Sequence, residues 1–189
     1  MTEIVVCFDR DEAVSTNPHP DPNKPAVPLG WVKYLAHAAE GVDVWATGNQ
    51  TLRQEAAIPG TERALAIWEA LGVEKDGRFS IPDPLRFDLP RRDRLHVVQD
   101  LYAAGGRDPT FVVVDDVDLG NMARYGWRHF FPWDFVAAVE RGEAPVAVPD
   151  DHGYSDAPYE TDEQATAPHF DPQAAEDGPS TRRATGERE

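Results

Sequence analysis

Short runs of consecutive apolar residues alternate along this chain with segments whose apolar residues recur at helical spacing. Residues 4–8 and 111–114 are almost entirely β-branched or aromatic, which is typical of strands buried on both faces of a sheet. Residues 42–46 and 128–131 predict two further strands, and residues 78–81 a fifth. Such strands, alternating with helices, favour parallel sheets with helices on both faces. The sequence therefore predicts an α/β fold, a three-layer sandwich around a mostly parallel, Rossmann-like sheet.

Helices are expected between these strands. Pro28 suits the first turn of a helix over residues 29–40, and Gly41 suits its end. Asp93 is expected to cap a helix that ends at Gly105. The remaining predicted helices cover residues 61–71, 119–125 and 134–141. Five prolines within residues 17–28 predict a stiff loop between the first strand and the first helix.

The composition changes near residue 149. Residues 150–189 hold eleven acidic residues and three arginines, which is half of the formal net charge of -16, and few apolar residues. Such a segment buries too little apolar surface to offset the entropy lost on ordering. We therefore expect one domain over residues 1–148 and an acidic, largely disordered tail over residues 149–189. A tail that folds on a protein partner is the alternative.

The strong negative charge limits the partners of this chain. An acidic surface repels nucleic acid phosphates and anionic lipids, so neither nucleic acid nor a membrane is expected as a partner. The chain also has only three lysines against fifteen arginines. Short carboxylates that retain water and cations suit a protein adapted to concentrated salt, and an ordinary acidic protein is the alternative.

A cytoplasmic location is the expectation from cysteine usage and hydropathy. Cys7 is the only cysteine, so no disulfide forms within the chain, and its apolar neighbours suggest a buried thiol. The N-terminal residues carry no basic and apolar signal. No apolar run approaches the roughly 20 residues that span a bilayer.

Polar side chains follow three of the predicted strands. Asp9 and Asp11 follow the first strand, Thr47 follows the second, and Asp115 and Asp116 follow the strand at 111–114. The carboxyl ends of parallel strands meet at one edge of a sheet, where ligands bind, so these side chains are expected to converge. Each also has a structural alternative, since aspartate and threonine are common in turns and helix caps.

The order of these residues resembles the haloacid dehalogenase superfamily of phosphohydrolases. Val5–Asp11, with its Asp-Arg-Asp core, resembles the first motif of that family, an apolar strand followed by Asp-x-Asp-Gly-Thr. Val44–Asn49 resembles the second motif, a strand ending in Thr or Ser, and Val112–Asp116 the fourth, a strand ending in an acidic pair. The third motif is a basic residue near a helix start. Arg91, Arg92 and Arg94 all qualify, and Arg92 is favoured.

The resemblance implies a magnesium-dependent phosphohydrolase that acts on a small-molecule phosphate ester. Asp9 would attack phosphorus to form an aspartyl phosphate, and Asp11 would act as the general acid and base. Mg²⁺ prefers oxygen ligands, and the converging carboxylates need a cation to neutralise them. The implied metal ligands are Asp9, Asp11 through its backbone carbonyl, Asp115 and Asp116. Thr47, Gly48 and Arg92 would bind the phosphoryl oxygens.

The chain departs from the family pattern at the first motif. Glu12 and Ala13 replace the Gly-Thr that follows the second aspartate, and Glu12 adds a negative charge. The interval between Asp11 and Thr47 is also too short for a large cap domain, which implies an open, capless site. A catalytically weakened module that binds a phosphorylated ligand or a protein is therefore the alternative function.

Molar potassium or sodium chloride should raise the melting temperature if the chain is adapted to salt. The predicted domain without its tail still carries half of the net charge of -16, and salt shortens the screening length to about 3 Å at 1 M. The measurement is thermal unfolding across a salt series. An unchanged or lower melting temperature would rule out the halophilic interpretation.

Overall fold

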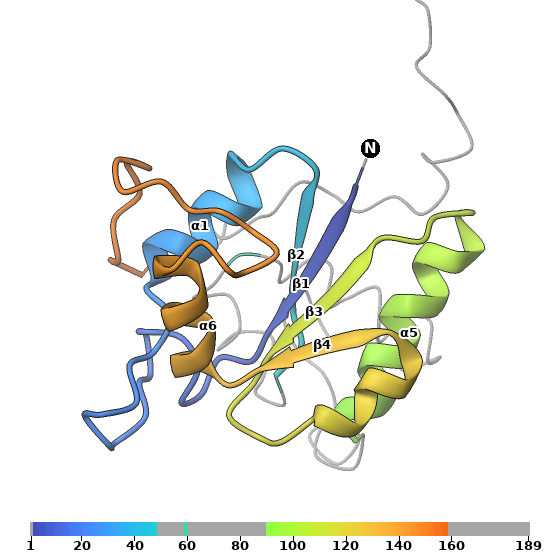
Figure 1. The fold of residues 1–189 in the computed structure, drawn as a ribbon, viewed down its shortest axis with the longest axis horizontal. Coiled ribbons are helices and arrows are strands. Elements are labelled where there is room, and N and C mark those ends of the chain that lie inside the picture. The colour runs from blue at the N-terminus through green and yellow to red at the C-terminus, as the bar shows by residue number, and fades with distance from the viewer. Residues whose placement is uncertain (1, 49–58, 60–89, 159–189) are drawn as a thin grey trace, which may run out of the picture.

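The computed structural model describes residues 2–48, 59 and 90–158 (Figure 1). Four strands form one sheet in the order β2-β1-β3-β4, and every neighbouring pair is parallel. The strands are β1 (Ile4–Phe8), β2 (Val42–Ala46), β3 (Thr110–Val114) and β4 (Trp127–Phe130). The predicted α/β fold with a parallel, Rossmann-like sheet is confirmed. The full three-layer sandwich stays a prediction, since the helix and strand predicted at 61–71 and 78–81 lie outside the described residues.

Helices pack against the sheet through two separate apolar clusters. The described helices are α1 (Leu29–His37), α5 (Arg91–Ala104), α6 (Pro132–Glu140) and the 3₁₀ helix η1 (Gly120–Tyr125). None of these helices is long and apolar enough to cross a membrane.

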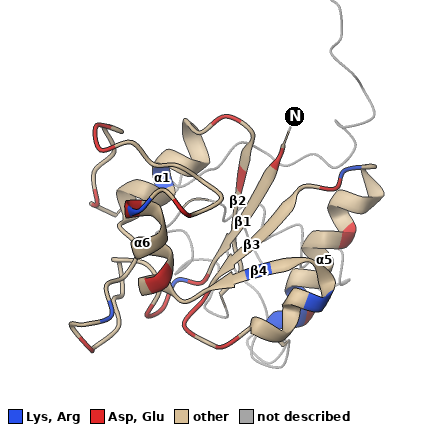
Figure 2. Cartoon of the chain, in the orientation of Figure 1, with Lys and Arg blue, Asp and Glu red and all other residues tan. Residues whose placement is uncertain are grey.

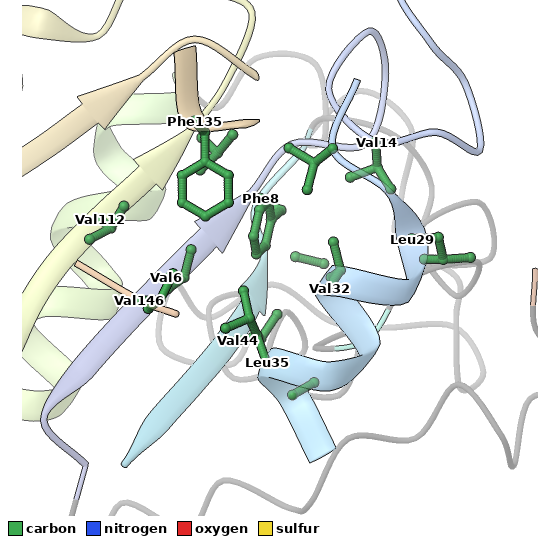
Figure 3. Close-up of a cluster of buried hydrophobic side chains, with 14 of the residues drawn as sticks. Val6, Phe8, Val14, Leu29, Val32, Leu35, Val44, Val112, Phe135 and Val146 are labelled. Carbon is green, nitrogen blue, oxygen red and sulfur yellow. The ribbon is translucent and has the colours of Figure 1, made fainter. Parts of the chain in front are cut away.

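Successive residues of β1 alternate between the two clusters, as the pleat of a strand requires. Val6 and Phe8 join α1 and α6, and Figure 3 shows Phe8 beside Phe135 of α6, with ring centroids 5.8 Å apart. Val5 and Cys7 join α5 and η1 in the other cluster. Because all four residues are fully buried, β1 is the centre of the core, as its continuous apolar run predicts.

Several element boundaries differ from the sequence-based expectations. α1 ends at His37, three residues before the predicted end. α5 begins at Arg91 after Pro90, so Asp93 lies in the first turn instead of capping the helix. There the negative charge of Asp93 interacts favourably with the partial positive charge at the N-terminus of the helix. α6 begins two residues early, at Pro132, because proline fits the first helical turn, where its missing N–H is not needed.

Residues 149–158, hereafter the strap, pack against α1 although the sequence places them in the tail. The Gly30 N–H donates to Asp156 Oδ1 at 2.7 Å. Lys33 Nζ donates to two strap carbonyls, at 3.0 and 2.5 Å. The chain therefore stays in contact with α1 past residue 148, and the boundary between domain and tail stays a prediction. Polar contacts attach much of the strap, so its hydrophobic pattern gives little sign of this packing.

Gly30→Ala should detach the strap. A Cβ atom at residue 30 would lie 2.6 Å from the backbone oxygen of Tyr154 and 3.1 Å from Asp156 Oδ1, closer than atoms pack. We expect limited proteolysis to cut the strap faster in this variant. In a chain ending at residue 148, the same change should stabilise α1 by up to about 1 kcal/mol, because alanine is the better helix former. Unchanged cleavage of the full-length variant would contradict the docking.

Candidate functional site

The register of the sheet brings three predicted site residues to the same level. Phe8 of β1 is paired with Val114 of β3. The ladder continues beyond the strand ends, where the Asp9 N–H donates to the Val114 carbonyl at 3.0 Å and the Thr47 N–H donates to the Phe8 carbonyl at 2.9 Å. Asp9, Thr47 and Asp115 thus occupy neighbouring positions at the carboxyl edge, as the strand-end pattern predicts.

The same three residues share one face of the sheet. Cys7 and Val113 point into the cluster that contains α5. Side chains two residues apart lie on the same face of an extended chain, so Asp9 and Asp115 continue along the α5 side. Asp9, Thr47 and Asp115 are all buried, with exposed fractions of 0%, 4% and 1%.

Asp9, Asp115 and Asp116 form a compact group, hereafter the acid cluster. One carboxylate oxygen from each residue lies within 4.8 Å of the others, a spacing at which three acids can hold one metal ion. Asp116 is half-buried. Three of the four predicted metal ligands are therefore brought together, and nothing in the geometry identifies which ion they would hold.

Arg91 is the basic residue that contacts the acid cluster. Its Nη1 atom lies 3.1 Å from Asp9 Oδ2 and 3.6 Å from Asp116 Oδ1, and it donates a hydrogen bond to Asp115 Oδ1. The sequence favours Arg92 for this position. Arg92 is instead exposed. Successive residues of a helix point about 100° apart, so when Arg91 points toward the sheet edge, Arg92 points away from it.

Arg94, the third candidate, supports the loop after β2. Its guanidinium is buried, and Nη1 donates to the carbonyls of Thr47 and Gly48, at 3.2 and 2.5 Å. The three arginines lie in the first turn of α5, whose charged residues are coloured in Figure 2. The first turn of α5 thus supplies Arg91, which pairs with the acids, and Arg94, which holds the loop after β2 through hydrogen bonds.

Asp11 does not join the acid cluster. Its Oδ1 atom accepts hydrogen bonds from Arg10 Nη1 at 3.0 Å and from Asn17 Nδ2 at 2.6 Å, and its side chain is 38% exposed. The predicted general acid and base is therefore held in the loop after β1, where Asn17 belongs to the proline-rich segment.

Glu12 has the only left-handed backbone of any non-glycine residue in the described part of the chain, with φ of 56°. This region favours glycine because a Cβ atom crowds the backbone there. The Glu12 carboxylate lies 3.4 Å from His19 Nε2. His19 Nδ1 accepts a hydrogen bond from the Asp21 N–H, and Lys24 Nζ also lies 3.4 Å from His19 Nε2.

Two buried polar side chains of the site have unused hydrogen-bonding capacity. Within the described part of the chain, Asp9 has a single ion pair, between its Oδ2 atom and Arg91 Nη1, although a carboxylate can accept several hydrogen bonds. Thr47 Oγ1 has no hydrogen-bond partner among the described residues. Buried polar atoms normally have hydrogen-bond partners, so unused capacity of this kind is typical of a position that a ligand completes.

Burial opposes full ionisation of the acid cluster. Burial, and then the charge of Asp115, raise the pKa of Asp9 to about 8, although Arg91 opposes the shift. Burial also raises the pKa of Asp115. Burial alone would lower the pKa of Arg91, but the three carboxylates outweigh it and raise that pKa. Without a further cation, Asp9 is therefore largely protonated at neutral pH.

A cavity of about 240 Å³ adjoins the acid cluster. Its lining comes from the start of α5 and from the loop after β3, and consists of Pro90, Arg91, Arg92, Val117 and Leu119. Arg91 borders both the cavity and the acid cluster. A ligand in the cavity would meet two guanidinium groups and an apolar wall.

Comparisons with protein-family models, with curated proteins and with solved structures find no match to this chain. The resemblance to the haloacid dehalogenase superfamily therefore rests on the residues quoted above.

Asp9→Asn should remove a pH dependence of stability. The pKa of Asp9 rises from 3.8 to about 8 on folding, so wild-type stability should fall as pH increases through this range, where the folded state holds the proton and the unfolded state releases it. In the absence of divalent cations, we expect the variant to be more stable at pH 8, by on the order of 1–3 kcal/mol, and about equal near pH 4.

Denaturant unfolding at several pH values measures this difference. Asp118→Asn is the matched control, since Asp118 is exposed and its Oδ1 accepts only the Gly120 N–H among the described contacts. Its stability curve should run parallel to that of the wild type. If the stability of Asp9→Asn also changed with pH as that of the wild type does, the prediction would be wrong, and Asp9 would be ionised in the folded protein.

Proposed function

We propose that this protein is a magnesium-dependent phosphohydrolase that acts on a phosphate ester through an aspartyl phosphate at Asp9. The observation that carries the proposal is the acid cluster at the carboxyl edge, with a fully buried Asp9 whose Oδ2 atom lies 3.1 Å from Arg91 Nη1. A carboxylate fixed at a strand end is oriented for attack and loses little freedom in the reaction.

The donor set fits Mg²⁺. This ion prefers oxygen ligands at about 2.1 Å, so oxygens on opposite sides of it lie about 4.2 Å apart. The carboxylate oxygens of the acid cluster lie within 4.8 Å of one another, so small side-chain movements would let Asp9, Asp115 and Asp116 share one ion. When bound, Mg²⁺ would neutralise these acids, which lowers the pKa of Asp9, and polarise a phosphoryl oxygen.

In the proposed reaction, an ionised Asp9 oxygen attacks phosphorus and the ester bond breaks, while Asp11 protonates the departing oxygen. Asp11 then takes a proton from a water molecule that attacks the aspartyl phosphate, which releases inorganic phosphate and regenerates Asp9. This role requires the Asp11 carboxylate to leave Asn17. Thr47, Gly48, Arg91 and Arg92 would bind the phosphoryl oxygens.

Two observations outside the acid cluster support the proposal. Glu12 has a left-handed φ of 56° at the position where the family motif has glycine, the residue that adopts this conformation most readily. The adjoining cavity of about 240 Å³ offers space for the rest of the ester.

A second function, a non-enzymatic module that binds a phosphorylated ligand or a protein, is favoured by the position of Asp11. A carboxylate held by Arg10 and Asn17 cannot transfer protons at Asp9. If Asp11 stays there when ligand binds, the site can bind a phosphoryl group without turning it over.

Asp9→Asn should abolish hydrolysis of a phosphate-ester panel in the presence of Mg²⁺, because an amide is a far poorer nucleophile and metal ligand. Asp11→Asn should slow turnover by about 10²–10⁴-fold and leave one phosphoryl group on Asp9, because the intermediate then lacks its general base. Mass spectrometry of the quenched reaction measures the trapped group.

Asp118→Asn is again the matched control and should keep wild-type turnover. Wild-type protein that hydrolyses no ester with Mg²⁺, yet binds inorganic phosphate, would favour the binding module. Full activity of Asp9→Asn would exclude the aspartyl phosphate.

A further inference from the structure

One nitrogen of Arg91 lies among all three carboxylates of the acid cluster. Nη1 is 3.1 Å from Asp9 and 3.6 Å from Asp116, and it is hydrogen-bonded to Asp115. A planar guanidinium has five N–H donors and usually binds carboxylates through two nitrogens in parallel. Here a single atom serves three acids from two strand ends. A compact cation held by the same oxygens would lie in this position.

The charge of Arg91 does not balance the group that surrounds it. Three carboxylates face one guanidinium, and Arg91 is the only arginine, lysine or histidine side chain whose ion pair with them is seen among the described residues. An ion of charge +2 would compensate the acids more fully and would fit among oxygens whose spacing is within 4.8 Å. A divalent cation should therefore bind where the guanidinium nitrogen lies.

The adjoining cavity offers a second position for the Arg91 guanidinium. Its side chain is 18% exposed and it lines the adjoining cavity together with Arg92 and the apolar residues Val117 and Leu119. The backbone of Arg91 is in the first turn of α5, so its long side chain can change direction without moving the helix. A displaced guanidinium would enter this cavity beside Arg92.

We propose that Arg91 is an exchangeable internal cation of the acid cluster: a divalent cation displaces its guanidinium into the adjoining cavity, where Arg91 and Arg92 bind an anionic group. This inference rests on the metal site of the proposed function and adds a sequence of binding steps to it. The cation binds first and creates the anion site. Because coupling is reciprocal, inorganic phosphate should tighten cation binding by the same factor that the cation tightens phosphate binding.

The first experiment compares Mg²⁺ binding to full-length wild type, Arg91→Gln and Arg141→Gln by isothermal titration calorimetry. Arg141→Gln is the matched control, since it removes the same charge from an exposed ion pair with Glu143. We expect Arg91→Gln to bind Mg²⁺ about tenfold or more tightly than wild type, and Arg141→Gln to bind it as wild type does. The Mg²⁺ affinity of Arg91→Gln falling to or below that of wild type would overturn the proposal.

The second experiment uses wild-type protein, so it does not depend on the folding of a variant. An arginine-selective reagent followed by peptide mapping measures the reactivity of Arg91. Mg²⁺ should increase this reactivity several-fold, and added inorganic phosphate should reverse the increase. This result separates displacement from simple charge repulsion, in which Arg91 stays among the acids and its reactivity does not rise. An unchanged or lower reactivity with Mg²⁺ bound overturns the proposal.

The outcomes also separate this proposal from the proposed function. Binding of Mg²⁺ to wild type and Arg91→Gln with equal affinity would overturn the exchange and leave the metal site intact. Binding to Arg91→Gln alone would mean that Arg91 holds the cation position without leaving it, which would overturn the exchange and contradict a magnesium-dependent wild-type enzyme. Absence of binding to both proteins would overturn both.

Discussion

The pairing of β1 with β2 and β3 in register determines where the strand-end polar groups of the site lie. Because the ladder continues one residue past the strand ends, Asp9, Thr47 and Asp115 are level with one another. The pleat then directs their side chains toward α5, which begins at Arg91. A slip of one residue in the pairing of β1 with β3 would turn one acid to the opposite face of the sheet, and a slip in the pairing with β2 would turn Thr47. The acid cluster is thus a direct consequence of strand register.

Much of this arrangement follows from the sequence because it depends on local pattern. Continuous β-branched runs specify buried parallel strands, and a polar residue at the end of such a run has to lie at the sheet edge. The positions of Asp9, Thr47, Asp115 and Asp116 are therefore predictable from the order of residues along the chain. The parallel sheet and the helices that follow its strands are confirmed for the same reason.

The parts that the sequence does not predict depend on the direction of single side chains. Arg91 and Arg92 are adjacent and chemically identical, and only the rotation of α5 about its axis decides which one meets the acids. Asp11 lies two residues from Asp9, but hydrogen bonds with Arg10 and Asn17 hold its carboxylate elsewhere. The strap has a composition that suggests disorder, yet Lys33 and the Gly30 N–H on α1 attach it through polar contacts. Hydrophobic periodicity carries no information about any of these three.

A buried group of acids with one guanidinium among them is the physical basis for the proposed cation site. The most direct test is a crystal structure of the full chain grown with Mn²⁺, with anomalous scattering used to locate the ion. The account predicts an anomalous peak within bonding distance of Asp9, Asp115 and Asp116, with the Arg91 guanidinium moved away from them. A fully ordered acid cluster that retains Arg91 and shows no peak would contradict it.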